Sequence, residues 1–274
     1  MTINCKGKLI DLNSPKVMGI INTTPNSFYA ESRKTSEKDI LKQVEKMLKD
    51  GADFIDVGGY STPPGAPKVE ETEELKRVLP AIENILKQFP DTLISIDTFR
   101  ANVAKKSIEA GAAIINDISA GSLDPEMMKT VAMHQVPYIM MHMRGTPQTM
   151  KDLNQYDDLL QDILFYFSEK INAARALGIN DLIVDPGFGF AKNIDQNFEL
   201  LSKMELFKTL ELPLLAGLSR KSLIYKTLKT SAAEALNGTT FLNTIALTKG
   251  ANILRVHDVK EAVECTKLFA ELNK

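Results

Sequence analysis

The sequence contains few cysteines and histidines, the residues that form disulfides and typical zinc sites. It has no tryptophan, and its only two cysteines, Cys5 and Cys265, lie near opposite ends of the chain. Without a CxxC pair, a disulfide framework and a cysteine-rich zinc site are excluded, and we expect a reduced intracellular setting. The three histidines, His134, His142 and His257, lack the spacing of metal ligands, and the HExxH and GxSxG motifs are absent. These absences argue against zinc-protease and serine-hydrolase functions.

Strong charge and long apolar runs are also missing. The net charge is −2 and the isoelectric point is about 6.0, so we expect no nucleic-acid or membrane partner. The N-terminus, MTINCKGKLIDL, lacks the basic and then apolar pattern of a signal peptide. No apolar run approaches the roughly 18 residues that a membrane span requires. We therefore predict a cytoplasmic protein whose function depends on a local site.

The sequence does contain a repeated pattern of apolar segments. Its 274 residues, 44% of them hydrophobic, suffice for two modest domains or one large barrel. Apolar residues also recur at helical spacing between the segments, for example Ile40, Val44 and Met47. The segments, which are rich in β-branched residues and which we predict as strands, are 17–22, 53–58, 93–97, 113–118, 138–143, 181–185, 214–219 and 252–257.

Alternating strands and helices with short connections predict parallel strands joined by helical crossovers. An open doubly wound sheet would also satisfy this pattern, but eight buried strands in about 250 residues are typical of a closed barrel. We therefore predict an α/β fold, a single (β/α)8 TIM barrel. No linker divides the chain, so residues 1–274 are expected to form one domain. The loop after the fifth strand, RGTPQTMKDLNQYDD, should lead into a helix that runs to about Ala176.

Almost every predicted strand ends on a polar or charged residue. In a barrel the C-terminal ends of the strands converge on one mouth, where binding residues collect. Such residues can also cap the next helix, which is our interpretation of Asp258, but capping does not account for the whole set. We therefore predict a shared pocket. The residues at the strand ends are Asn22, Asp56, Asp97, Asn116, Asp117, His142, Asp185, Ser219, Arg220, Lys221, Arg255 and His257.

The pocket is expected to have two chemically different ends. Lys221, Arg255 and His257 cluster at the seventh and eighth strands, where barrels commonly bind phosphate beside a helix N-terminus. The carboxylates and amide of the third, fourth and sixth strands can instead accept hydrogen bonds from a flat, nitrogen-rich ring. A phosphorylated heterocycle satisfies both ends. The glycines in DPGFGFAKN do not match a dinucleotide-binding or P-loop motif.

Eight motifs in order along the chain carry a family resemblance: MGIINTTPNSF, ADFIDVGGYSTPPGA, ISIDTFRANVA, GAAIINDIS, MMHMRGTPQTM, DPGFGFAKN, GLSRKS and RVHDV. Together they are similar to the dihydropteroate synthases, the sulfonamide-inhibited enzymes of folate biosynthesis. The resemblance implies a (β/α)8 barrel and a homodimer. It also implies a transferase reaction between 6-hydroxymethyl-7,8-dihydropterin pyrophosphate and p-aminobenzoate, which gives 7,8-dihydropteroate and pyrophosphate.

The resemblance also assigns roles to residues, with Mg²⁺ as the cofactor. The residues that it implies to be catalytic are Lys221, Asp97, Asp185, Arg255 and His257. The implied pterin-binding residues are Asp97, Asn116, Asp185 and Lys221. The implied pyrophosphate-binding residues are Asn22, Thr62, Arg255 and His257, with Asn22 also a magnesium ligand. The implied p-aminobenzoate and sulfonamide pocket comprises Phe28, Thr62, Pro64, Phe190, Lys221 and Ser222.

Two loops depart from the family pattern. The first has Asn26 where the family has an aspartate, and the second has Tyr60 and Pro63 where a glutamate and an arginine are usual. Losing the arginine removes a cation near the p-aminobenzoate carboxylate, and the proline stiffens the backbone. A non-catalytic pterin-binding paralogue would show such drift and stays an alternative. A pterin-dependent methyltransferase is a second alternative, but it would need neither SRKS nor RVHD for an anion.

Overall fold

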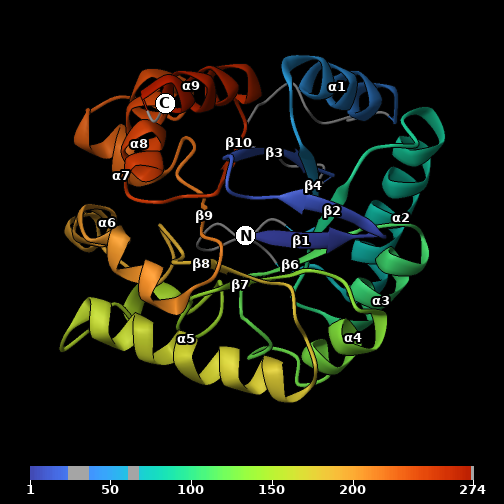
Figure 1. The fold of residues 1–274 in the computed structure, drawn as a ribbon, viewed down its shortest axis with the longest axis horizontal. Helices are drawn as coiled ribbons and strands as arrows, with labels where there is room; N and C mark the ends of the chain where they lie inside the picture. Colours follow the sequence, from blue (N-terminus) through green and yellow to red (C-terminus); the bar gives the residue numbers. More distant parts are fainter. Residues whose placement is uncertain (24–36, 61–67, 273–274) are drawn as a thin grey trace.

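The computed structural model describes residues 1–23, 37–60 and 68–272, and eight parallel strands form its centre (Figure 1). The hydrogen-bonded order is β8-β7-β6-β5-β4-β3-β10-β9, and an isolated parallel bridge between Val184 and Leu214 joins the two ends. The predicted (β/α)8 barrel is therefore confirmed. The strands are β3 (Lys16–Asn22), β4 (Phe54–Gly58), β5 (Ile94–Asp97), β6 (Ile114–Asp117), β7 (Tyr138–Met141), β8 (Leu182–Asp185), β9 (Leu215–Ala216) and β10 (Ile253–Val256).

Helices surround the strands as an outer ring (Figure 1). Their inner faces supply most of the apolar core, which lies between the strands and the helices. The helix after the long loop ends at Ala176, as predicted. No helix in the described ranges is long and apolar enough to cross a membrane. The helices are α1 (Glu37–Asp50), α2 (Glu71–Gln88), α3 (Ala101–Glu109), α4 (Met127–His134), α5 (Leu159–Ala176), α6 (Ile194–Ser202), α7 (Ser222–Thr227), α8 (Leu236–Thr248) and α9 (Val259–Leu272), with 3-10 turns at Met150–Asp152 and Met204–Leu210.

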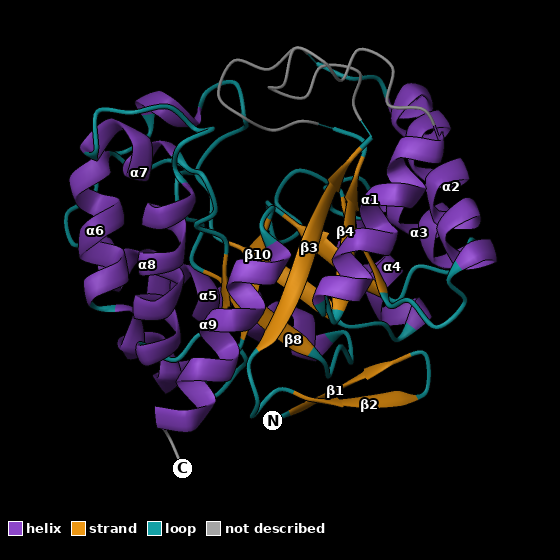
Figure 2. Ribbon diagram, turned by 90° about the horizontal axis from the view of Figure 1, so that it is seen from above, coloured by secondary structure: helices purple, strands orange, loops and turns teal. Residues whose placement is uncertain are grey.

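An N-terminal hairpin covers one end of the barrel, and our sequence analysis did not predict it. Strands β1 (Thr2–Cys5) and β2 (Lys8–Asp11) pair in antiparallel fashion beneath the N-terminal ends of the barrel strands (Figure 2). Lys6 and Gly7 both have positive φ, as a two-residue hairpin turn requires. Apolar side chains of the hairpin and of the barrel interior form one cluster. The hairpin thus closes this end and leaves the opposite mouth for a binding site.

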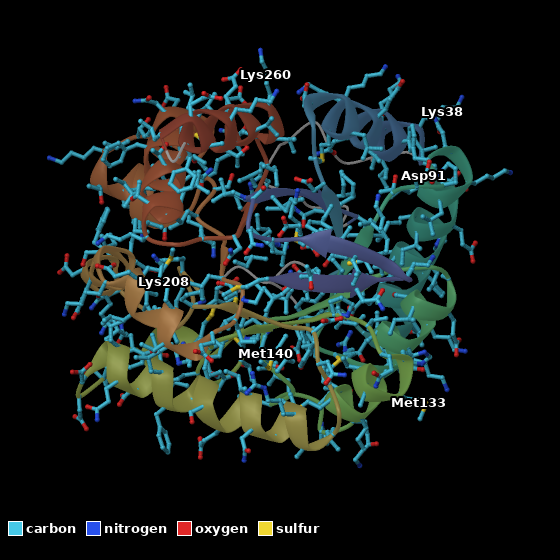
Figure 3. All side chains as sticks on the ribbon, viewed as in Figure 1. Lys38, Asp91, Met133, Met140, Lys208 and Lys260 are labelled. Carbon is cyan, nitrogen blue, oxygen red and sulfur yellow. The ribbon has the colours of Figure 1, made fainter. Side chains whose placement is uncertain are left out.

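The methionine-rich segment at β7 lies in the core. Met140 is fully buried near the centre of the molecule, whereas Met133 on α4 is 77% exposed at its edge (Figure 3). Parallel barrel strands are covered on both faces, which explains why this segment is continuously apolar instead of alternating. The apolar run nevertheless ends on His142, whose side chain is buried. The strand is thus followed by a buried polar ring that packs against Tyr166.

Candidate active site

A buried ion-pair cluster lies inside the mouth of the barrel, at the ends of β4, β5, β6 and β10. Arg255 donates from Nε to Asp56 Oδ2 and from Nη2 to Asp97 Oδ2, each at 2.6 Å. Asn116 donates from Nδ2 to the same Asp56 oxygen at 3.1 Å. Parallel pairing places Asp97 beside Asn116 and opposite Gly58, which has no side chain to fill the mouth. Strand register therefore brings together groups that are far apart in sequence.

In this cluster, burial and the neighbouring opposite charges shift the pKa values of Asp97 and Arg255 in opposite directions. Burial raises the pKa of Asp97 to about 7, although the neighbouring Arg255 acts to lower it. Burial acts to lower the pKa of Arg255, but Asp56 and Asp97 outweigh it and hold that pKa above its ordinary value. Asp56 is fully buried, and its Oδ1 has no hydrogen-bond partner among the described residues. The guanidinium is therefore what makes two buried carboxylates tolerable.

Two further groups of opposite charge, Asp185 and Lys221, lie beside the Arg255 cluster. Burial raises the pKa of Asp185, and Lys221 opposes this shift most strongly. Asp185 Oδ2 and Lys221 Nζ both lie 3.9 Å from the position that a Cβ on Gly217 would occupy, so the glycine leaves room between them. Burial lowers the pKa of Lys221 to about 8, and Asp185 opposes that shift. With Asp56, Asp97 and Arg255, the mouth contains three carboxylates and two cations, which suits a ligand rich in N–H donors.

The loop between β8 and α6 lies against Lys221. Lys221 Nζ donates to the carbonyl oxygen of Phe188 and lies 4.8 Å from the ring centre of Phe190. Gly189 has a φ of +81°, and a Cβ there would lie 3.2 Å from the Lys221 side chain. Ser222 follows Lys221 directly as the first residue of α7. The lysine is therefore held between two loops that both contribute to the mouth.

His257 and Ser219 form a separate polar contact at the rim. Ser219 Oγ accepts from the backbone N–H of His257 at 3.1 Å and lies 3.0 Å from its Nδ1. Ser219 Oγ can donate its own hydrogen to Nδ1, and in that tautomer Nε2–H remains as a donor. Desolvation and then the charge of Arg255 lower the pKa of His257, so this donor is neutral. The side chain of Asp258, interpreted above as a cap, pairs with Arg220 at 2.8 and 2.9 Å.

Comparisons with known proteins agree with this geometry. Residues 18–257 match the family model described as pterin binding enzyme. The chain belongs to this family. It is 42% identical to the dihydropteroate synthase of Escherichia coli K12 over 98% of this chain and 95% of that protein. The Synechocystis dihydropteroate synthase is 44% identical over 92% of this chain and 88% of its own length.

Solved structures of dihydropteroate synthases have the same fold as this pterin-binding enzyme. The Yersinia pestis enzyme in complex with a sulfonamide drug gives a TM-score of 0.95 at 40% identity, covering 100% of this chain and 99% of that one. The Xanthomonas albilineans enzyme with 4-aminobenzoic acid gives 0.92 at 36% identity, with 99% and 98% covered. The predicted dihydropteroate synthase family, and with it the transferase class, is confirmed.

The structure brings most of the predicted site residues of this pterin-binding enzyme to one mouth. Five of the predicted positions lie outside the described residues and stay predictions: Asn26, Phe28, Thr62, Pro63 and Pro64. Those at the mouth are Asn22, Asp97, Asn116, Asp185, Phe190, Lys221, Ser222, Arg255 and His257.

Tyr60, one of the divergent positions, is buried and well packed. Its ring makes an edge-on contact with Phe99 at a centroid distance of 5.3 Å, and the guanidinium of Arg100 lies 5.4 Å from its centre. Its hydroxyl accepts from Gln148 Nε2 at 3.0 Å. Gln148 belongs to the loop after β7, so Tyr60 connects two loops at the mouth. Tyr60, which stands where the family usually has a glutamate, is therefore held in place by specific contacts.

The oxygen atoms at the mouth fit a magnesium ion whose coordination shell is completed mainly by phosphate and water. Asn22 ends β3 with an exposed side chain, and its Oδ1 and Asp97 Oδ2 each lie 3.8 Å from the position that a Cβ on Gly58 would occupy. No group of three or more histidine, cysteine or acidic side chains in the described ranges is arranged to hold a metal. Mg²⁺ typically takes few protein oxygens and completes its shell with phosphate and water. One exposed amide oxygen at the mouth suits that chemistry.

Two residues that are central in the structure, Asp56 and Lys192, could not be assigned a role from the sequence. Asp56 was recognised only as a polar strand end, yet it accepts from both Arg255 and Asn116. The signal available in the sequence was a carboxylate inside the apolar run DFIDVG. Lys192 had no such signal. Its contacts depend entirely on how the loop after β8 folds.

Proposed function

We propose that this chain joins 6-hydroxymethyl-7,8-dihydropterin pyrophosphate to p-aminobenzoate, giving 7,8-dihydropteroate and pyrophosphate. The observation that carries the proposal is the set of acceptors formed by buried Asn116 and Asp185 and half-buried Asp97, with Lys221 beside it. A pterin ring presents several N–H donors at one edge, and buried acceptors bind such donors selectively because water cannot replace them. Related dihydropteroate synthases have been solved in complex with a sulfonamide drug, 4-aminobenzoic acid and 7,8-dihydropteroate.

In the proposed pterin subsite, Asp97, Asp185 and the Asn116 carbonyl accept from ring N–H groups, and Lys221 donates to a ring acceptor. Bond breaking begins at the exocyclic methylene, where the C–O bond to pyrophosphate breaks and both electrons leave with the oxygen. The dihydropterin ring delocalises the resulting positive charge, and the neighbouring carboxylates stabilise it. The pre-formed charges of the mouth therefore favour the transition state over the ground state.

The second substrate completes the reaction. The amine nitrogen of p-aminobenzoate attacks the methylene carbon, forms the C–N bond and then releases one proton to solvent. An uncharged arylamine is already nucleophilic, so the proposal requires no strong general base. Ser222 follows Lys221 in sequence, and the Phe190 ring lies against Lys221 Nζ. We assign both residues to the p-aminobenzoate subsite, together with Phe28, Thr62 and Pro64.

In the proposed pyrophosphate subsite, His257 donates through Nε2–H, and Arg255 donates through Nη1 because Asp56 and Asp97 already use its Nε and Nη2. Thr62 is assigned to the same subsite. Asn22 would hold Mg²⁺ together with pyrophosphate oxygens and water. The ion would offset the negative charge that develops on the leaving group.

The decisive experiment measures pyrophosphate release by the purified full chain with dihydropterin pyrophosphate and Mg²⁺, with and without p-aminobenzoate. Release that depends on p-aminobenzoate supports the proposed reaction. Binding of the pterin substrate without any release would instead support the alternative of a non-catalytic pterin-binding paralogue.

Magnesium dependence is expected to involve Asn22. Chelation with EDTA should stop pyrophosphate release, and added Mg²⁺ should restore it. Replacing Asn22 by alanine should raise the Mg²⁺ concentration needed for half-maximal rate about tenfold, since one of few protein ligands is lost. Asn102→Ala, at an exposed position on α3, is the control. An unchanged Mg²⁺ dependence in Asn22→Ala would rule out the assigned ligand.

The divergent loop positions are expected to affect inhibitor selectivity. Changing Tyr60 to glutamate and Pro63 to arginine together restores the usual family residues and a cation for the p-aminobenzoate carboxylate. Because sulfonamides lack that carboxylate, the ratio of sulfonamide affinity to p-aminobenzoate affinity should fall. The ratio is measured by titration calorimetry with both ligands on the wild type and the double variant. Finding the same ratio in both proteins would contradict this prediction.

We also propose a homodimer of single-domain chains in the cytoplasm. Helices α8 and α9 pack against each other and carry three strongly exposed apolar residues: Phe241 (64% exposed), Leu268 (69%) and Leu272 (80%). A second copy of the chain would cover them. Light scattering should show that Phe241→Lys with Leu268→Lys converts a dimer into a monomer. Phe165→Lys, at an equally exposed position on α5, should remain a dimer. A dimer in both variants would contradict this interface.

A further inference from the structure

A second lysine lies behind the loop that holds Lys221. Lys192 Nζ donates to the carbonyl oxygens of Gly187 and Phe190, both at 3.0 Å, and lies 3.0 Å from Nδ1 of His142. Its Nζ thus has partners in three directions, while burial lowers the pKa of Lys192 to about 7. Within the described ranges Lys192 makes no salt bridge with a carboxylate. The Lys192 side chain therefore holds the backbone of its own loop.

His142 gives this contact a rigid anchor. It follows β7, its backbone N–H donates to the Asp185 carbonyl at 3.0 Å, and it is only 2% exposed. Its ring packs edge-on against Tyr166, with 4.9 Å between centroids. Burial and then the charge of Lys192 lower the pKa of His142 well below its ordinary value. A neutral ring in this position can accept from Lys192 at Nδ1.

The loop between β8 and α6 requires both glycine and internal hydrogen bonds to adopt its shape. Gly187 has a φ of +74°, and a Cβ at this position would lie 2.1 Å from the carbonyl oxygen of His142. Its own carbonyl oxygen accepts from Phe190 N–H at 3.1 Å as well as from Lys192. On the other side of the loop, Gly189 N–H donates to Asn197 at 2.6 Å. The turn is thus held from both sides.

The outer side of the same loop faces the proposed substrate subsites. The Phe188 carbonyl accepts from Lys221, and the Phe190 ring lies against Lys221 Nζ. The Phe190 carbonyl, by contrast, points to Lys192. Losing Lys192 would therefore release Phe190 first, while Phe188 would keep its contact with Lys221.

We propose that Lys192 is a positioning residue that fixes Phe190 as a wall of the arylamine subsite. The inference rests on the proposed function, which places p-aminobenzoate against Phe190 and the pterin against Lys221. A purely structural lysine would lower the population of folded protein, and with it the apparent kcat, without changing either KM. A positioning lysine affects the arylamine much more than the pterin.

The test compares Lys192→Met, which keeps the aliphatic stem, with Lys203→Met, an exposed lysine that pairs with Glu199 just after α6. In Lys192→Met the KM for p-aminobenzoate should rise about tenfold and the KM for dihydropterin pyrophosphate less than about threefold. Lys203→Met should change neither. Equal increases in both KM values, or a lower melting temperature with unchanged KM values, would overturn the proposal.

A second variant covers the case in which Lys192→Met does not fold. His142→Phe keeps the packing against Tyr166 but removes the Nδ1 acceptor, so a smaller rise in the same KM is expected. Calorimetric binding of a sulfonamide to the full chain gives a readout besides turnover and should weaken in parallel. If wild type releases no pyrophosphate, the proposed reaction fails, yet the binding comparison still tests Lys192. A wild type that binds neither arylamine nor sulfonamide would overturn both proposals.

Discussion

Replacing Arg255 by methionine is expected to lower the free energy of unfolding by about 3–5 kcal/mol and to abolish pyrophosphate release. The substitution keeps much of the side-chain volume but leaves Asp56 and Asp97 buried without their cation. Two carboxylates in one low-dielectric site repel each other, and neither can regain its hydration. Urea denaturation with linear extrapolation measures the stability change, and the assay with and without p-aminobenzoate measures the activity.

A second substitution distinguishes lost charge balance from lost packing. Asp56→Asn in the Arg255→Met background removes one carboxylate, so it should recover a large part of the stability without recovering activity. Lys46→Met, which breaks an exposed helical pair with Asp50, is the control and should have a much smaller effect. Arg255→Met within about 1 kcal/mol of wild type would mean that the cluster does not need its guanidinium.

Replacing Lys221 by methionine is expected to reduce kcat/KM by about 10²–10³-fold while the protein stays folded. In the described site, the Lys221 ammonium is the only cation that contacts the Phe188 carbonyl, and it also lies beside Asp185. In the proposed mechanism it donates a hydrogen bond to the pterin as well. Lys226→Met, at an exposed position on the same short helix, is the matched control. Steady-state kinetics with both substrates measures the effect. A loss of less than about threefold would contradict the assigned role.

The same residue predicts a pH dependence of pterin binding. The pKa of Lys221 in the folded protein is about 8, below its ordinary value of 10.5. The ammonium needed for binding is therefore lost as pH rises through about 8, so pterin affinity should fall there. Folding stability changes with the opposite sign, because the folded state binds fewer protons between pH 8 and 10.5 and so gains stability as pH rises. Lys221→Arg should move the fall in affinity to higher pH, which calorimetry across this range would detect.

The strands could be predicted because their sequence pattern is strong. Every predicted strand overlaps an observed one, because apolar segments rich in β-branched residues alternate with stretches of helical spacing along the chain. The hairpin at the N-terminus was missed because Thr2–Cys5 and Lys8–Asp11 are short and half-exposed. Such strands become recognisable only when the barrel end that they cover is known.

For the site, the sequence indicated which residues share the mouth but not how their charges are paired. Arg255 was predicted to bind an anion, and it also holds two carboxylates of the chain itself. Asp56 received no role because Arg255 lies 199 positions away, and Lys192 received none because its partners are set by the shape of its own loop and by His142, 50 positions away. Pairing across such separations depends on strand register and loop shape, which no local pattern specifies.

The sequence by itself determined the barrel, the family and the set of polar residues at the strand ends. Hydrophobic periodicity and motif order are local properties, so they can be recognised along the chain. Only the tertiary structure decided that Asp56 and Asp97 share Arg255, that Tyr60 connects two loops, and that Lys192 fixes the loop behind Lys221. These arrangements depend on distances of a few ångströms between segments that only the closed barrel brings together.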